Sequence, residues 1–211
     1  MRWTKPLLLA GALAAPLFIA TDLVAATLLY PGYDYTSQQV SELSAIGAPT
    51  RTFWLAMGYP YSLLLLALAA GTWLSATRTA QRVVAVLIAL FTAHSFAWAL
   101  FAPMHMRGTE FGDTDTAHIA FTVVAVLLMT GFITAGALLF GRGFRLYSAL
   151  TVIAMVASGG IVGTQISAIA AGEPTPWMGL VERIAVYGPI VWTAVFALAL
   201  WSRTEEAGSP P

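Results

Sequence analysis

The sequence has no cysteine and very little charge. Without cysteine it can form no disulfide, no thiolate metal site and no cysteine nucleophile, which excludes a disulfide-stapled extracellular domain. Its 10 basic and 10 acidic residues make up 9% of 211 residues, whereas a soluble domain carries roughly 25%. A soluble globular domain and a disordered chain are therefore excluded. The balanced charge provides no field that attracts a polyanion, so we expect no nucleic-acid partner.

Apolar residues make up 58% of the chain. A transmembrane helix needs about 20 mostly apolar residues, and six stretches qualify: residues 6–30, 52–76, 82–102, 117–140, 146–170 and 177–201. The sequence therefore predicts an all-α polytopic membrane protein with a bundle of six transmembrane helices, whose main partner is the lipid bilayer. We expect one domain over residues 1–203 and a disordered cytoplasmic tail over residues 204–211.

The basic residues predict the direction of the spans. Seven of the 10 fall at the termini or in the even-numbered loops, namely Arg2, Lys5, Arg78, Arg82, Arg142, Arg145 and Arg203. Cytoplasmic loops carry the excess of Lys and Arg, so both termini are predicted to be cytoplasmic. One alternative stays open: Arg2, Lys5, the apolar run to residue 20 and the small residues at 25–26 also fit a cleaved signal peptide, which would leave five spans.

Polar residues inside the predicted spans gather in their outer halves. They are Asp22, His94, His118, Gln165, Glu182 and Arg183. An ionisable group at membrane depth costs roughly 2.5–3.5 kcal/mol on insertion scales, so such groups usually face a bundle interior or water. The sequence therefore predicts an outward-facing polar pocket. Adjacent helical residues point about 100° apart, so Glu182 and Arg183 should have different partners. For Arg183 these are Asp22, Glu182 or a bound anion.

The first outer loop contains a predicted short helix. Thr36 and Gln39 have the spacing of a capping box, and Val40, Leu43 and Ile46 then recur at helical spacing. We expect an amphipathic helix at the outer interface. Two interpretations remain open. The helix caps the bundle, or it forms a lid over the pocket, with Asp34, Ser41 or Glu42 contacting a ligand.

The third outer loop supplies further candidate ligands. Asp113 and Asp115 precede His118 at the start of the fourth span, and Asp115 with His118 has the i, i+3 spacing of an orienting pair. A capping role alone fits equally well. A zinc site could combine His94, His118 and one of Asp113, Asp115 or Glu182, although no sequence spacing enforces it. No other cofactor is predicted.

Two further patterns concern the third and fifth spans. His94 and His105 would lie roughly 16 Å apart on a continuous helix, so only a break at Pro103 could bring them to one metal. Gly159 and Gly163, with Gly160 beside them, have the spacing of closely packed membrane helices. We interpret this motif as packing within the chain in preference to a dimer seam.

Three segments together resemble a known family. They are Pro31-Gly32-Tyr33-Asp34 leading to Ser41-Glu42-Leu43, the Asp-rich turn ending at His118, and Gly179-Leu180-Val181-Glu182-Arg183-Ile184. They are similar to domain-of-unknown-function family 998, a group of bacterial and archaeal membrane proteins. The resemblance implies a six-helix protein in the inner membrane of a prokaryote and supplies no reaction. The family's third span usually ends Phe-Pro-x-Asp, whereas this chain has Phe101-Ala102-Pro103-Met104-His105.

These patterns leave several functions open. The outward pocket predicts a protein that binds a small molecule or a lipid headgroup. The alternatives are a membrane-embedded metal-dependent hydrolase acting on a lipid, a small transporter, and an accessory or structural subunit. A transporter is disfavoured because no paired broken helices occur. A single six-helix transporter would also need to form a homodimer.

Overall fold

A computed structural model describes residues 3–109 and 111–206. Helices form almost all of its regular structure, and these residues contain no strand beyond an isolated bridge between Ile46 and His105. The helices are α1 (Thr4–Ala12), α2 (Ala14–Val24), α3 (Arg51–Leu74), α4 (Thr79–Phe101), α5 (Asp113–Ala137), α6 (Arg142–Gly163), α7 (Ile166–Ala170) and α8 (Met178–Glu206). The predicted all-α class is confirmed.

Six apolar stretches of helix are long enough to cross a membrane. They are Thr4–Leu29, Arg51–Leu74, Thr79–Phe101, Asp113–Ala137, Arg142–Gly163 and Met178–Thr204. The chain is therefore a multi-pass membrane protein, and each helix pairs its own backbone groups as the bilayer requires. The boundaries differ from the predicted ones by a few residues at most ends. The largest difference is at the fifth span, where residues 164–165 separate α6 from α7.

The first span is not one straight helix. α1 ends at Ala12 and α2 begins at Ala14, and a π-helical turn, Ala25–Leu29, completes the span. Pro16 lies four residues after Ala12. Its ring replaces an N–H and clashes with the carbonyl four residues earlier, which explains the break at this point.

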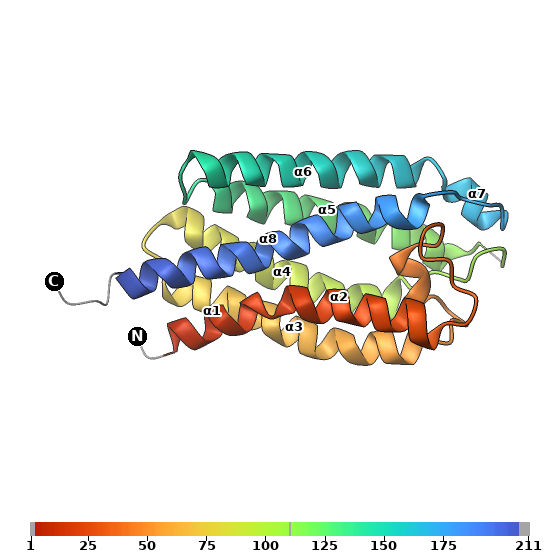
Figure 1. Ribbon diagram of the computed structural model, residues 1–211, viewed down its shortest axis with the longest axis horizontal. Helices are drawn as coiled ribbons and strands as arrows, with labels where there is room; N and C mark the ends of the chain where they lie inside the picture. The colour runs from red at the N-terminus through yellow and green to blue at the C-terminus, as the bar shows by residue number, and fades with distance from the viewer. Residues whose placement is uncertain (1–2, 110, 207–211) are drawn as a thin grey trace.

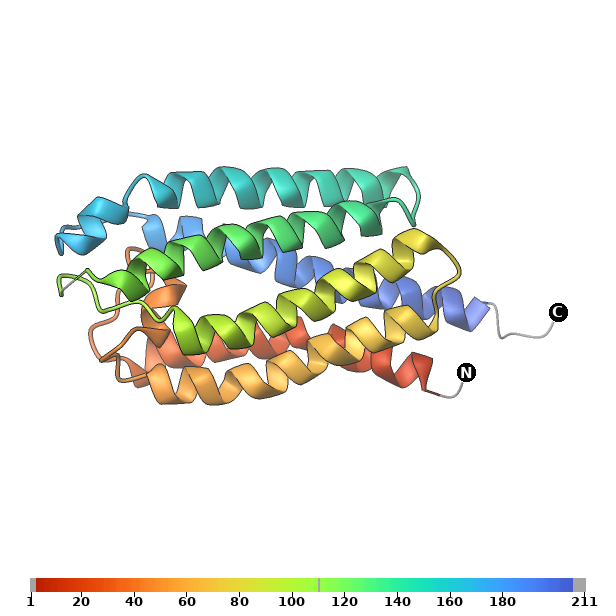
Figure 2. The same cartoon turned by 180° about the vertical axis from the view of Figure 1, so that it is seen from behind.

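The long helices form a closed ring. Around the ring α1 contacts α3, then α3 contacts α4, α4 contacts α5, α5 contacts α6, α6 contacts α8, and α8 returns to α1. Figures 1 and 2 show these helices running side by side, with both termini at one end. We name this end the terminal end. The opposite end, which carries the segments 30–50, 102–112 and 164–177, is the loop end.

The ring is filled with side chains towards the terminal end. Trp192 and Phe196 stack at 4.9 Å between ring centroids, and both are fully buried. Phe132, Ile133 and the other members of one large buried cluster surround them, drawn from α1, α2, α3, α4, α5, the turn after α5, and α8. Trp192 Nε1 donates to Ser148 Oγ at 2.9 Å, so the buried indole nitrogen has a partner. This half of the bundle is a packed apolar core.

The first loop folds over the loop end, and its helix is shorter than predicted. It consists of a single 3-10 turn, Val40–Ser44, whose side chains Val40, Glu42 and Leu43 are buried. The predicted capping pair of Thr36 and Gln39 is wrong. The backbone N–H of Gln39 donates instead to Glu42 Oε1 at 2.9 Å. Of the predicted tail, residues 204–206 still belong to α8, which continues through Glu206; residues 207–211 lie outside the described residues.

Candidate functional site

A cavity of about 620 Å³ lies inside the ring towards the loop end. Most of its wall is apolar, and the wall comes from α2, α3, α4, α5, α6 and α8. Representative wall residues are Phe18, Phe91, Ile119, Met155 and Val186. The volume lies in the range of about 300–1,000 Å³ typical of small-molecule sites.

The polar groups of this cavity are concentrated at its loop end. Ser41, Asp115, His118 and Glu182 belong to the predicted site residues and line it, together with Arg51 and His105. His118 and Glu182, which come from α5 and α8, therefore face one cavity. The other predicted site residues lie outside its lining: Asp22, Asp34, Glu42, His94, Asp113, Gln165 and Arg183. An apolar chamber with a polar end suits a ligand that has an apolar part and a polar part.

Asp22 and Arg183 form a buried ion pair beside the cavity. Arg183 Nε and Nη2 donate to the two carboxylate oxygens of Asp22 at 2.8 and 2.9 Å, and the two side chains are 4% and 0% exposed. Tyr187 Oη also donates to Asp22. The structure thus selects Asp22 from the partners that the sequence left open for Arg183. A buried pair with this bidentate geometry satisfies charges that would otherwise be costly in the membrane.

The same arginine holds the first loop in place. Arg183 Nη1 donates to the backbone carbonyls of Tyr35 and Gly179 at 2.9 and 3.0 Å, and its guanidinium lies 3.5 Å from the Tyr35 ring centroid. Arg183 Nη2 donates to Tyr33 Oη at 3.0 Å. Burial raises the pKa of Tyr33, so its hydroxyl stays protonated at neutral pH. The ion pair of Asp22 and Arg183 therefore joins the first loop to α2 and α8.

Gly179 permits this close approach. A Cβ atom there would lie 2.3 Å from the carbonyl oxygen of Gln38 and 2.6 Å from that of Tyr35. Such distances are far below van der Waals contact, so only glycine fits without moving the first loop. The family-like segment beginning at Gly179 thus reflects packing as well as charge.

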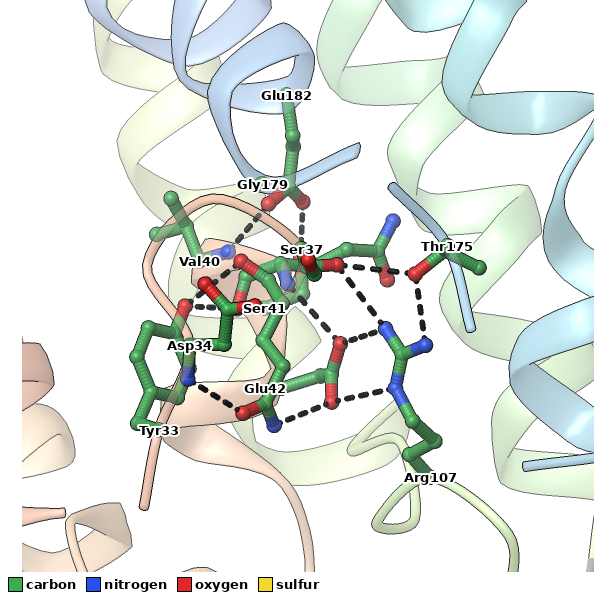
Figure 3. A network of polar contacts seen from close by, with 12 residues as sticks. Tyr33, Asp34, Ser37, Val40, Ser41, Glu42, Arg107, Thr175, Gly179 and Glu182 are labelled. Carbon is green, nitrogen blue, oxygen red and sulfur yellow. Dashed lines mark hydrogen bonds and ion pairs between the residues drawn. The ribbon is translucent and has the colours of Figure 1, made fainter. Parts of the chain in front are cut away.

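Glu182 makes a second contact with the first loop, at the loop end of the cavity. Its carboxylate accepts hydrogen bonds from the backbone N–H of Val40 and from Ser41 Oγ, the latter at 2.8 Å (Figure 3). All three residues line the cavity. Because Glu182 and Arg183 point in different directions, one helix turn fixes the first loop at two separate points. This divergence agrees with the prediction from helical geometry.

Arg107 joins three loops in one network. Its Nη2 donates to Glu42 Oε1 at 2.7 Å, and its Nη1 donates to Thr175 Oγ1 at 2.7 Å (Figure 3). Thr175 Oγ1 in turn donates to the carbonyl of Ser37 at 2.9 Å. The first, third and fifth loops are therefore tied together through Arg107. Sequence reasoning missed this role; the one signal available was a basic residue among the predominantly acidic outer loops.

His105 and Asp115 form a pair at the cavity. His105 Nδ1 lies 2.6 Å from Asp115 Oδ2, and the backbone N–H of His105 donates to Asp115 Oδ1 at 2.8 Å. The predicted pairing of Asp115 with His118 is therefore replaced by one with His105. α4 ends at Phe101, just before Pro103, and the chain then folds back towards the start of α5. Within the described residues, His105 Nε2 has no hydrogen-bond partner.

The other two histidines have separate surroundings. His118 Nδ1 lies 2.9 Å from both Trp98 Nε1 and the carbonyl oxygen of Ala102. It cannot satisfy both at once, because it accepts from the indole only when unprotonated and donates to the carbonyl only when protonated. His94 packs between Trp98 and Phe121, and neither of its ring nitrogens has a partner in the described part of the chain.

The predicted zinc site is not assembled. Among residues 3–109 and 111–206, no three His, Asp or Glu side chains are grouped closely enough to hold a metal ion. Of the proposed ligands, Asp115 is committed to His105, His118 to Trp98 or Ala102, and His94 to an aromatic contact. The donor set therefore does not fit zinc, which takes three or four ligands at about 2.0–2.3 Å.

The remaining predicted site residues have local roles. Asp34 Oδ1 accepts from the backbone N–H and the hydroxyl of Thr36 at 2.9 and 2.7 Å. These hydrogen bonds and those from Ser37 lower the pKa of Asp34 to about 2. Asp113 is exposed in the first turn of α5, where an acid is favourable. Gln165 stands at the N-cap position of the short helix α7, and its side chain makes no capping hydrogen bond there.

The glycines of α6 do not serve the predicted helix packing. A Cβ atom at Gly159, Gly160 or Gly163 would meet no heavy atom within 4 Å. Gly159 and Gly163 instead line the cavity, whereas Gly160 does not. Because glycine has no side chain, these two positions leave space inside the ring.

Comparison with known proteins identifies a family and no closer relative. The model of a family described as "Protein of unknown function (DUF998)" matches residues 12–199. The match covers most of the chain, and the protein belongs to this family. No curated protein and no solved structure matches it.

Proposed function

We propose that this DUF998 protein binds a lipid or lipid-like amphiphile in the cavity, with its apolar part between the helices and its polar head at the loop end. The observation that carries this proposal is the distribution of the lining. Apolar side chains form the walls, while Ser41, Glu182, His105 and Asp115 lie together at one end. We further propose that the loop end faces outward, as the distribution of basic residues predicts.

The cavity also reaches residues on the outside of the bundle. Tyr59, Leu100 and Val123 line it, yet they are 64%, 73% and 55% exposed. In a membrane protein such exposed apolar residues contact lipid tails. A ligand already dissolved in the bilayer could therefore enter from the side, which favours an amphiphile over a water-soluble molecule.

The packed terminal end favours binding over transport. Trp192, Phe196 and Phe132 fill the ring below the cavity and are at most 2% exposed. A transporter needs an alternating path to both faces, and these three buried aromatic side chains stand in the centre of the ring on the way to the terminal end. The proposed site thus has one polar end.

Two adjacent glycines of α6 provide a matched test. Gly159→Leu would place a side chain in the cavity, whereas Gly160→Leu would place the same side chain outside its lining. Replacing glycine inside a helix favours the helix by up to about 1 kcal/mol, so both variants should fold. We would measure the lipid retained per chain by native mass spectrometry after purification in mild detergent.

The expected result is that the wild-type chain and Gly160→Leu retain the same bound amphiphile, and that Gly159→Leu loses most of it. Equal retention by all three proteins would show that lipid binds elsewhere. A wild-type protein that retains none, and takes up none when lipid is added, would also overturn the proposal. Thermal unfolding curves of the three proteins serve as the folding control.

The His105–Asp115 pair supports a second candidate function, hydrolysis of an ester-containing amphiphile. Asp115 orients the imidazole through Nδ1, which leaves Nε2 available as a base. In this reaction Nε2 takes a proton from water while the water oxygen bonds to the ester carbonyl carbon. The carbon–oxygen bond of the leaving alcohol then breaks, and the alkoxide receives the proton.

Assays of purified protein with ester lipids in detergent would test this candidate. Turnover should fall at least roughly 100-fold in His105→Gln, in line with loss of a general base, and should persist in Arg142→Gln, a change on the exposed terminal end. Absence of turnover by the wild-type protein, or unchanged turnover in His105→Gln, would exclude this role and leave the binding proposal intact.

A further inference from the structure

The three arginines at the loop end differ in one respect. Arg183 forms an ion pair with Asp22, and Arg107 forms one with Glu42. No carboxylate in the described residues forms an ion pair with Arg51. Its Nη1 donates to the backbone carbonyl of Ser44, and the guanidinium has no other hydrogen-bond partner there. Arg51 thus keeps most of its hydrogen-bonding capacity.

Arg51 is also the arginine that lines the cavity. It is the first residue of α3, it is half-buried, and it lies at the polar end of the chamber. Neither Arg107 nor Arg183 belongs to the lining. A guanidinium presents several donors in a planar fork, which matches the oxygens of a phosphate or carboxylate.

The two acids of the cavity are already engaged by other donors. Asp115 accepts hydrogen bonds from the backbone N–H groups of His105 and Gly112 and contacts the His105 ring. Glu182 accepts from Val40 and Ser41. These contacts direct both carboxylates towards their own neighbours, so neither forms an ion pair with Arg51.

We infer that Arg51 binds the anionic headgroup of the amphiphile, through phosphate or carboxylate oxygens. The inference rests on the proposed function and specifies the chemical class of its ligand. The apolar chain would occupy the walls formed by α4, α5 and α6, and the head would meet Arg51 beside Ser44. A half-buried guanidinium without an acid partner gains most from a ligand that brings its own negative charge.

Two lipids with the same acyl chains separate charge from apolar contact. Phosphatidic acid carries an anionic phosphate head, whereas diacylglycerol ends in a neutral hydroxyl group. We would titrate each into detergent-purified protein and measure binding by native mass spectrometry, with inorganic phosphate as a third ligand. The proteins are the wild type, Arg51→Gln, Arg51→Lys and the control Arg142→Gln, whose arginine is exposed at the terminal end.

We expect the wild type and Arg142→Gln to prefer phosphatidic acid. Arg51→Gln should weaken its binding roughly 10- to 100-fold, the range of a charged hydrogen-bonded contact, and should leave diacylglycerol binding nearly unchanged. Arg51→Lys should retain part of the preference, because it keeps the charge without the fork. Thermal unfolding of each variant verifies that the fold is intact.

The outcomes distinguish the inference from the proposed function. If the wild type binds both lipids equally, or if Arg51→Gln keeps the preference, Arg51 does not bind the headgroup and the lipid cavity stands. If inorganic phosphate binds with the same dependence on Arg51 and neither lipid binds, the anion site stands and the lipid proposal fails. If none of the three ligands binds to the wild type, both are overturned.

Discussion

The two halves of this bundle are built from the same six spans and differ in what fills the ring. Near the terminal end Trp192, Phe196 and Phe132 pack together within one buried apolar cluster. Towards the loop end the ring encloses about 620 Å³, and polar loops cover it. In a bilayer, association of helices depends on packing and hydrogen bonds, because lipid tails are as apolar as the side chains. The half at the terminal end is therefore stabilised by side-chain packing, and the half at the loop end by a polar network.

This comparison shows how the protein can keep a cavity and remain folded. The loop half cannot gain stability by filling its centre. It gains stability instead at its rim, where Arg183 with Asp22 and Arg107 with Glu42 join segments distant in sequence. Three pairs of variants test this division of roles, in order of decreasing effect.

Arg183→Gln should have the largest effect. It leaves the Asp22 carboxylate buried without its cation and releases the first loop from α8. Breaking a buried ion pair by removing one partner costs about 3–5 kcal/mol. We expect a large fall in thermal stability, measured by unfolding in detergent, whereas Arg142→Gln on the exposed surface should unfold like the wild type. Equal stability of the two variants would show that the network is not what secures the loop half.

Comparing Trp192→Ala with Ile119→Ala tests whether the two halves of the bundle differ in packing. Trp192 is fully buried in the packed core, so its removal should cost about 3–5 kcal/mol. Ile119 lines the existing cavity, and its truncation should cost less than the 2–5 kcal/mol usual for a core isoleucine. Equal losses, measured by thermal unfolding in the same detergent, would contradict a difference in packing between the halves.

Gly179→Ala should have a smaller, local effect. The added Cβ would overlap the carbonyl oxygens of Gln38 and Tyr35 and displace the first loop, at a cost of about 1–3 kcal/mol. Gly160→Ala, with open space around its Cβ, should be neutral or stabilising. Faster proteolysis within the first loop of the Gly179→Ala protein would show the displacement. Identical cleavage of the two variants would mean that the loop is not held there.

The sequence predicted the spans well, because apolar length is a property of each segment alone. It also predicted that Glu182 and Arg183 would diverge, since this follows from helical geometry, and it included Asp22 among the partners of Arg183. These predictions required no knowledge of how the loops fold.

The parts that the sequence did not predict depend on contacts between distant segments. Asp115 pairs with His105 and not with His118, because the chain turns back after α4. Gly159 and Gly163 have the spacing of a packing motif, yet they face empty space. Their spacing is compatible with both outcomes, and only the position of α5 relative to α6 decides between them. The central role of Arg107 likewise depends on three loops meeting at one point.

An experimental density map of the protein crystallised from a lipid bilayer phase would show whether the cavity at the loop end holds an amphiphile. We predict elongated density inside the ring, running from the region of Ile119 and Met155 towards Arg51 at the polar end. A map that shows the cavity filled only by water, or closed by movement of α5 against α6, would contradict the proposal that it binds an amphiphile.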